Sequence, residues 1–268
     1  MRRSLASLPV ALVAAAIACS GAGAVGAAAA APRVLDVPIL MYHRIDALTS
    51  RLAPITRRLT VTPADFAAQM RWLRGRGFHA LTEERLLAAL EHGATLPRRP
   101  ILVTFDDGYR DVLGKAAPVL HRLRIPATAF VITGRISGHD TSFLTWGGLR
   151  SLERDGVEIG SHTVTHRELT TLGNSEALGE LVASRKALEA QLGRPVPWLA
   201  YPAGAEDARI VALARGAGYA LAMTTHPGTT QDGRDPLGLH RIEVLDSTGV
   251  RGLAALLASA PPSGLSPG

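Results

Sequence analysis

Short apolar runs alternate with amphipathic segments along most of the chain. The runs Val37–Tyr42, Ile101–Phe105 and Ala127–Ile132 are typical of buried strands, and helical spacing of apolar residues follows them. Further strands are expected at 157–160, 198–201, 220–224 and 242–244. About seven such repeats, without a Gly-rich dinucleotide fingerprint, predict a single α/β domain: a distorted (β/α) barrel of about seven parallel strands.

Residues that start and stop helices support this reading. Thr62, before Pro63, and Thr82 are typical N-caps of two predicted helices. Gly93 ends the second of these helices. Further helices are expected at 109–123, 146–154, 175–192 and 207–217, with a short one after the last strand. The segment 44–60 is expected to be an irregular loop.

The two ends of the chain differ from the domain between them, residues 32–258. Residues 1–31 predict a signal peptide, with Arg2 and Arg3, an apolar run from Leu8 to Ala18 and then small residues, so the protein is expected to be secreted, periplasmic or envelope-associated. The single cysteine, Cys19, ends that apolar run. Lipidation there, with membrane anchoring, is the alternative to a plain cleaved leader. The Pro/Gly/Ser-rich tail, 259–268, is expected to be disordered.

Composition narrows the class of protein. A hydrophobic fraction of 47% excludes a disordered chain. The net charge is +6, but the basic residues are scattered and aromatic residues make up only 4%. With no basic stripe and few aromatic residues on which bases could stack, nucleic acid is not expected as a partner.

Two adjacent carboxylates follow the strand that ends at Phe105. Asp106 and Asp107, in Thr104-Phe105-Asp106-Asp107-Gly108-Tyr109, carry like charges whose repulsion a cation would relieve. Taken alone, this motif also fits a turn in which both residues cap a helix.

A histidine pair changes that balance. His162 and His166 lie four residues apart just after the strand ending at 160, so one helical turn would place both rings on the same face. Two histidines and a carboxylate form a three-ligand set for Zn²⁺ or a similar divalent ion, with positions left for water and substrate. The sequence therefore predicts a metal site.

These motifs resemble those of the polysaccharide deacetylases, the NodB-homology group or carbohydrate esterase family four, over about residues 36–245. The resemblance implies metal-dependent hydrolysis of an N-acetylated polysaccharide, with Asp106 as the base and with Asp107, His162 and His166 as ligands of a divalent metal, Zn²⁺ first among the candidates. The segments Pro38–Arg44 and Ala200–Gly204 look most like the branch that acts on poly-N-acetylglucosamine. A backbone N–H of the turn that begins at Tyr201 and includes Ala203 is then expected to stabilise the oxyanion.

The chain departs from the family pattern in three places. Ala200 stands where many members carry an arginine that orients the base, and the Asp-x-x-Trp motif is not recognisable. The Leu-x-His motif is imperfect, so His240 is assigned as the acid with His226 as a rival, and both also fit exposed loop positions.

His43, at a strand end, is expected to be structural or to position substrate.

Alternatives remain open from the sequence alone. Deacetylation of peptidoglycan, chitin or O-acetylated xylan would use the same residues, because substrate choice lies in loops such as 44–60 and 136–145. A non-catalytic glycan-binding relative is a further alternative, although a binding module would not need Asp106 beside a full ligand set.

Overall fold

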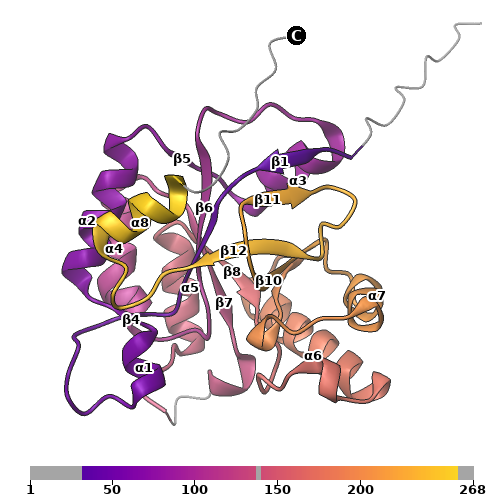
Figure 1. Cartoon of the computed structure of the whole chain (residues 1–268). Coiled ribbons are helices and arrows are strands. Elements are labelled where there is room, and N and C mark those ends of the chain that lie inside the picture. The colour runs from indigo at the N-terminus through magenta and orange to yellow at the C-terminus, as the bar shows by residue number, and fades with distance from the viewer. Residues whose placement is uncertain (1–31, 137–139, 259–268) are drawn as a thin grey trace, which may run out of the picture.

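The computed structural model describes residues 32–136 and 140–258, so the predicted signal peptide and C-terminal tail lie outside the described residues. Seven parallel strands form a closed ring in the order β2-β12-β10-β9-β8-β7-β6, and β6 pairs back onto β2. The strands of this ring are β2 (Ile39–Tyr42), β6 (Pro100–Phe105), β7 (Ala127–Val131), β8 (Val157–Ser161), β9 (Trp198–Ala200), β10 (Leu221–Pro227) and β12 (Leu239–Glu243). The predicted seven-stranded (β/α) barrel is confirmed (Figure 1).

Among the described residues, five short strands lie outside this ring, and the sequence analysis did not predict them. β5 (His79–Ala80) pairs with β6, β1 (Val34–Asp36) runs antiparallel to β11 (Thr230–Asp232), and β3 (Arg44–Ile45) runs parallel to β4 (Thr60–Val61). Strands of two or three residues are too short to show an alternating pattern. The expected irregular loop 44–60 is therefore wrong in part, because it contains β3, the first residue of β4 and a short helix, α1 (Pro54–Arg58).

The helices begin and end close to the predicted residues. Thr62 Oγ1 accepts a hydrogen bond from Asp65 N–H (3.1 Å), and Gly93 ends its helix at φ 69°. The helices are α2 (Pro63–Gly75), α3 (Glu83–His92), α4 (Ala117–Leu123), α5 (Trp146–Arg154), α6 (Asn174–Leu192), α7 (Ala208–Gly216) and α8 (Gly249–Ala258), with short turns η1 (Val112–Ala116), η2 (Thr133–Arg135), η3 (Leu169–Thr171) and η4 (Pro202–Gly204). The predicted helix 109–123 is thus split into a π-helical turn, η1, and α4. In the described part of the chain, no helix has the length and apolarity needed to cross a bilayer.

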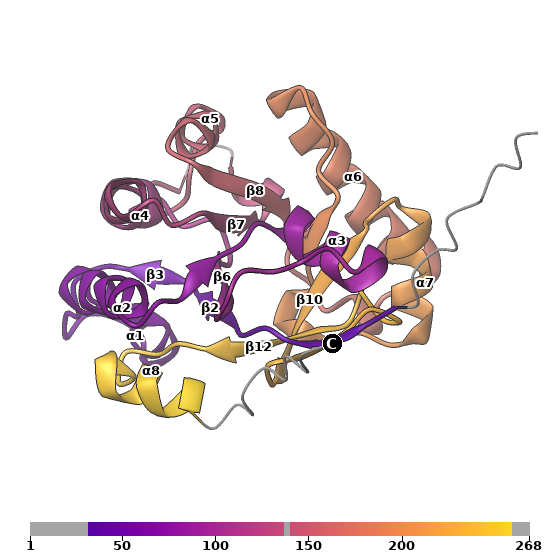
Figure 2. The same ribbon diagram turned by 90° about the horizontal axis from the view of Figure 1, so that it is seen from above.

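The hydrophobic core fills the amino-terminal half of the barrel and the space under the helices. Inward-facing Leu102, Phe130 and Leu239 pack with Leu86 and Leu90 of α3, which lies across the ring in the view from above (Figure 2). The alternate strand residues face outward and pack against helices such as α2 and α5. α3 closes the amino end, and the polar residues that follow the strands lie at the carboxyl end.

Candidate active site

The polar residues identified in the sequence follow the carboxyl ends of the barrel strands. His43 follows β2, Asp106 follows β6, His162 follows β8 and Tyr201 follows β9. Parallel pairing of Tyr42 with Phe105 brings the ends of β2 and β6 to the same level, and β7 and β8 are in register beside them. This end of a (β/α) barrel is where catalytic groups are held.

The turn after β6 separates the two adjacent aspartates. Asp107 has φ 73° and Gly108 has φ 83°, so two successive residues adopt the left-handed conformation. For a residue with a side chain this conformation is strained, and such strain is concentrated at functional sites. A Cβ at position 108 would lie 3.0 Å from a Val131 methyl carbon and would be strained at this φ, so glycine is favoured there. As a result, Asp106 and Asp107 have different partners.

Asp106 forms a buried ion pair with Arg241 of β12. The two guanidinium NH₂ groups of Arg241 donate to the two carboxylate oxygens at 2.8 and 2.7 Å, and both side chains are almost fully buried. Burial raises the pKa of Asp106, but nearby groups, Arg241 first among them, lower it more, so it falls to about 2. Asp106 is therefore ionised at any neutral pH and is fixed in orientation.

Arg241 is a site residue that the sequence analysis missed. The family arginine was sought at the position of Ala200 on β9, whereas the guanidinium reaches Asp106 from β12 and also donates to Thr224 O at 2.7 Å. The available signal was an arginine directly before the predicted strand 242–244. Such a residue is rarely buried without a charged partner.

Asp107, His162 and His166 come together as a possible ligand set. The Nε2 atoms of both histidines lie 3.5 Å from Asp107 Oδ1, and one ligand atom from each residue lies within 4.8 Å of the others. The rings of the two histidines are edge to face, with centroids 4.7 Å apart. Two imidazoles and one carboxylate at this spacing fit a divalent ion such as Zn²⁺ and leave coordination positions for other ligands.

His162 is held in the tautomer that a metal ligand needs. Its Nδ1 lies 2.7 Å from the carbonyl oxygen of Ala200, which can only accept, so Nδ1 carries the proton and Nε2 is free to coordinate. Burial lowers the pKa of His162 and outweighs the opposing effects of Asp106 and Asp107. The ring is therefore neutral, as coordination requires.

The expected reason for the pairing of His162 and His166 was wrong. The segment between them is not a helical turn, because Thr163 and His166 have φ values of 63° and 64°. Glu180 of α6 holds this irregular loop instead: its Oε2 accepts from the N–H groups of Val164 and Thr165, each at 2.9 Å. The rings meet because the loop folds back on itself, which the four-residue spacing alone could not show.

The backbone N–H groups of the turn after β9 differ in whether they are free to bind an oxyanion. Tyr201 N–H already donates to Met223 O at 3.0 Å, and its ring packs in a hydrophobic cluster, so the expected use of Tyr201 as a donor is corrected. Gly204 N–H donates to Tyr201 O. Ala203 is exposed at φ 55°, and its N–H has no acceptor among the described residues. Within this turn, Ala203 is the donor that remains.

His240 does not lie beside Asp106, contrary to the expectation. Residues 239 and 241 of β12 face the barrel interior, so His240 between them faces the opposite side of the strand. Its ring instead contacts that of His226, with centroids 6.0 Å apart. The Leu-x-His motif has imperfect spacing here, so the sequence did not show which side of the strand His240 faces.

His43 is close to Asp106. Ile39 faces the interior, so His43, four residues later in the same alternating pattern, follows on the same side. The positive charge of a protonated His43 contributes to lowering the pKa of Asp106. The Nδ1 atom of His43 is buried and has no hydrogen-bond partner among the described residues.

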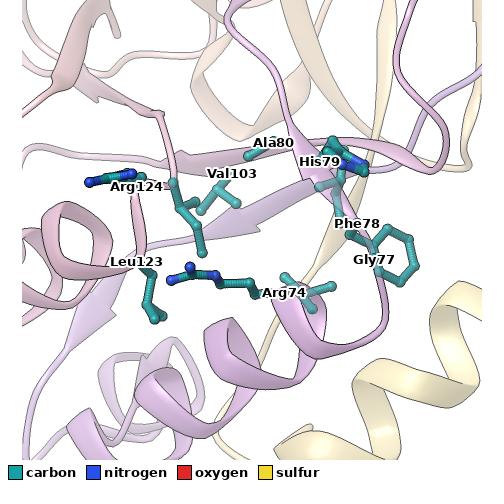
Figure 3. A pocket seen from close by; sticks show the side chains of 11 residues that line it. Arg74, Gly77, Phe78, His79, Ala80, Val103, Leu123 and Arg124 are labelled. Atoms are coloured by element: carbon teal, nitrogen blue, oxygen red, sulfur yellow. The ribbon is translucent and has the colours of Figure 1, made fainter.

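A separate cavity of about 290 Å³ lies at the amino end of β5 and β6, beneath α2 and α4 (Figure 3). Apolar side chains such as Leu73 and Ile101 and the basic side chains of Arg74 and Arg124 line its wall. Arg74 lies in the last turn of α2 and Arg124 caps the end of α4, where cations stabilise the helix dipole. These charges are explained by the helices, and the cavity is not part of the site.

Comparison with known proteins agrees with this geometry. Residues 93–222 match the polysaccharide deacetylase family. The chain is 32% identical over 218 residues to Bacillus subtilis (strain 168) YxkH, whose own name assigns it provisionally as a polysaccharide deacetylase; the match covers 81% of this chain and 74% of YxkH.

Two further relatives have more specific names. The poly-beta-1,6-N-acetyl-D-glucosamine N-deacetylase of Staphylococcus epidermidis is 30% identical over 185 residues, which cover 62% of this chain and 64% of that protein. The structure of the Streptococcus pyogenes deacetylase PplD in complex with acetate is similar at a TM-score of 0.75, with 27% identity, over 84% of this chain and 98% of PplD. The chain therefore belongs to the polysaccharide deacetylase family, carbohydrate esterase family four, and is a hydrolase that acts on carbon–nitrogen bonds.

Proposed function

We propose that this polysaccharide deacetylase is metal-dependent and removes N-acetyl groups from a polysaccharide that contains N-acetylglucosamine. The substrate that we propose first is poly-N-acetylglucosamine. The observation that carries the proposal is the placement of a fixed, ionised Asp106 beside the group Asp107, His162 and His166. The choice of substrate is supported by the name of the Staphylococcus epidermidis relative and by the segments Pro38–Arg44 and Ala200–Gly204.

Asp107, His162 and His166 would hold the metal. A divalent ion there supplies Lewis-acid polarisation of the acetamide carbonyl and acidification of a water molecule. The Nδ1 bond from His162 to Ala200 O fixes that imidazole before the ion arrives. Binding requires little rearrangement of this ligand.

Asp106 is the proposed general base. It makes both of its strong bonds to Arg241 and lies outside the ligand group, so its charge is available to accept a proton from the attacking water. Arg241 prevents the carboxylate from rotating, and it stabilises the ionised form before each turnover. Fixed orientation of this kind contributes to catalysis because the reacting groups need no rearrangement.

His43 is the proposed general acid, in place of His240. The amine must gain a proton to leave, and His43 lies on the same inner side as Asp106, whereas His240 faces away. The N–H of Ala203 is the proposed backbone donor to the oxyanion.

An exported location is part of the proposal. The features that support it are the two arginines, the apolar run and the small residues of the predicted signal peptide. A polymer of the cell envelope or biofilm matrix would be encountered there, and Cys19 offers an anchoring point if it is lipidated.

Acetate release from poly-N-acetylglucosamine oligomers tests the proposal directly. We expect release by the parent enzyme, loss after treatment with a chelator and recovery when Zn²⁺ is added back. Chitin, peptidoglycan and acetylated xylan oligomers are assayed in parallel. Faster release from one of these would overturn the substrate assignment, and unchanged release in chelator would overturn the metal dependence. Absence of release from all four would favour a glycan-binding role.

A further inference from the structure

The carboxylate of Asp111 holds the chain directly after His43. Its Oδ1 accepts from the backbone N–H of Ile45 at 2.9 Å, and its Oδ2 accepts from Arg44 Nε at 3.0 Å. The two residues that follow His43 are therefore both bound to one side chain. Asp111 itself lies four residues beyond Asp107, so these bonds link the turn after β2 to the turn after β6.

This arrangement is not explained by the helix that Asp111 precedes. Asp111 occupies the N-cap position of η1, where an aspartate usually accepts a bond from the first turn, yet its side chain makes no cap hydrogen bond. Its side chain is only 6% exposed. Burial raises the pKa of Asp111 despite the bonds from Ile45 and Arg44, so the carboxylate is kept in this place against an unfavourable desolvation.

His43 needs such external support. An acid or base histidine is usually oriented by a hydrogen bond to its second ring nitrogen, but the buried Nδ1 of His43 has no partner in the described part of the chain. Its orientation therefore depends on the backbone that carries it. That backbone is fixed before His43 by β2, which pairs with β6, and after it by the pairing of β3 with β4 and by the bonds to Asp111.

We propose that Asp111 is a positioning residue that aligns His43 with the leaving amine. This inference rests on the proposed function, in which His43 is the general acid. Asp111 acts only through residues 44 and 45 and does not contact the substrate. Arg44 also lies over the ring of Tyr109, 5.0 Å from its centroid, which further ties the turn after β2 to the Asp106–Asp107 motif.

A neighbouring ion pair provides a matched control. Lys115 bonds Asp46 in the same cluster, but neither atom of that pair contacts the Ile45 N–H. Lys115→Ala removes a more exposed ion pair from the same cluster while leaving both Asp111 bonds in place.

The test compares two substrates that differ in their need for an acid. An N-acetylglucosamine oligomer loses an amine, which must be protonated, whereas 4-nitrophenyl acetate loses a phenolate, which leaves without protonation. We expect Asp111→Ala to lower kcat for the oligomer about tenfold or more, with KM little changed and kcat for the ester near that of the parent. Asp111→Asn, which keeps one acceptor, should retain more amide turnover than Asp111→Ala. Lys115→Ala should behave like the parent.

Metal content and thermal unfolding are measured for every variant, and His43→Ala is combined with Asp111→Ala. If Asp111 acts through His43, the double variant should be no slower on the oligomer than His43→Ala. Equal losses on oligomer and ester, loss of metal, or additive effects would overturn the inference. A parent enzyme inactive on the oligomer would instead refute the proposed function, so the two failures are distinguishable.

Discussion

Arg241 and Asp106 form a bidentate ion pair inside the barrel, although they lie 135 positions apart in the chain. The arginine that orients the base in many family members was expected on β9, where Ala200 is found. The function of that arginine can therefore be supplied from another strand, provided that its guanidinium reaches the same two carboxylate oxygens.

Replacement of Arg241 should reduce both stability and activity. Arg241→Met leaves Asp106 as an unpaired buried charge, and losing one partner of such a pair costs about 3–5 kcal/mol of unfolding free energy. The carboxylate also loses its fixed orientation, so kcat should fall about tenfold or more. Urea unfolding and acetate release measure the two effects.

A second substitution separates charge from orientation in this pair. Arg241→Met combined with Asp106→Asn removes the unpaired charge, so it should regain stability relative to Arg241→Met alone while remaining inactive. Parental turnover in Arg241→Met would show that Arg241 does not orient the base.

The adjacent aspartates should fail in different ways. Asp106→Asn cannot accept a proton, so it should keep its metal while kcat falls about a hundredfold to ten-thousandfold. Asp107→Asn weakens a ligand, so it should lose metal affinity and regain part of its activity at high metal concentration. Elemental analysis beside turnover checks both, and the opposite pattern would mean that the two roles are exchanged.

Histidine substitutions should affect metal and turnover separately. His162→Ala should lower metal content and activity together, because it removes a ligand. His43→Ala should keep the metal, and its amide turnover should fall by about a hundredfold or more. His240→Ala should retain amide turnover, because His240 faces away from Asp106. The assignment of the acid reverts to His240 if its variant, rather than that of His43, is the inactive one.

Glu83 should make the stability depend on pH. Burial raises its pKa from 4.5 to about 8, a hydrogen bond from Thr128 lowers it, and the charge of Glu158 raises it. Since the folded state binds the proton more tightly, the favourable contribution is present below about pH 4.5 and is lost as the pH rises through about 8. Glu83→Gln does not titrate, so its melting temperature should exceed the parental value more at pH 9 than at pH 5. The exposed neighbour substitution Glu84→Gln is the control, and an equal difference at both pH values would show that Glu83 does not titrate in this way.

Local sequence determined the elements of this protein. Thr62 before Pro63 began a helix, Gly93 ended one, and the apolar runs before Asp106 and His162 formed parallel barrel strands, because caps and periodicity act over a few residues. The motif residues Asp107, His162 and His166 were also grouped correctly, since they follow strands whose carboxyl ends meet at one end of a barrel.

Tertiary structure decided which side chains meet and which way they face. The helical turn expected between His162 and His166 is instead a loop held by Glu180, and the partner of Asp106 comes from β12. In that strand a single position decides whether a side chain faces the interior, as Arg241 does, or the opposite side, as His240 does. The motif spacing carried no information on this choice, because the faces of a strand are set by packing against strands and helices distant in the sequence.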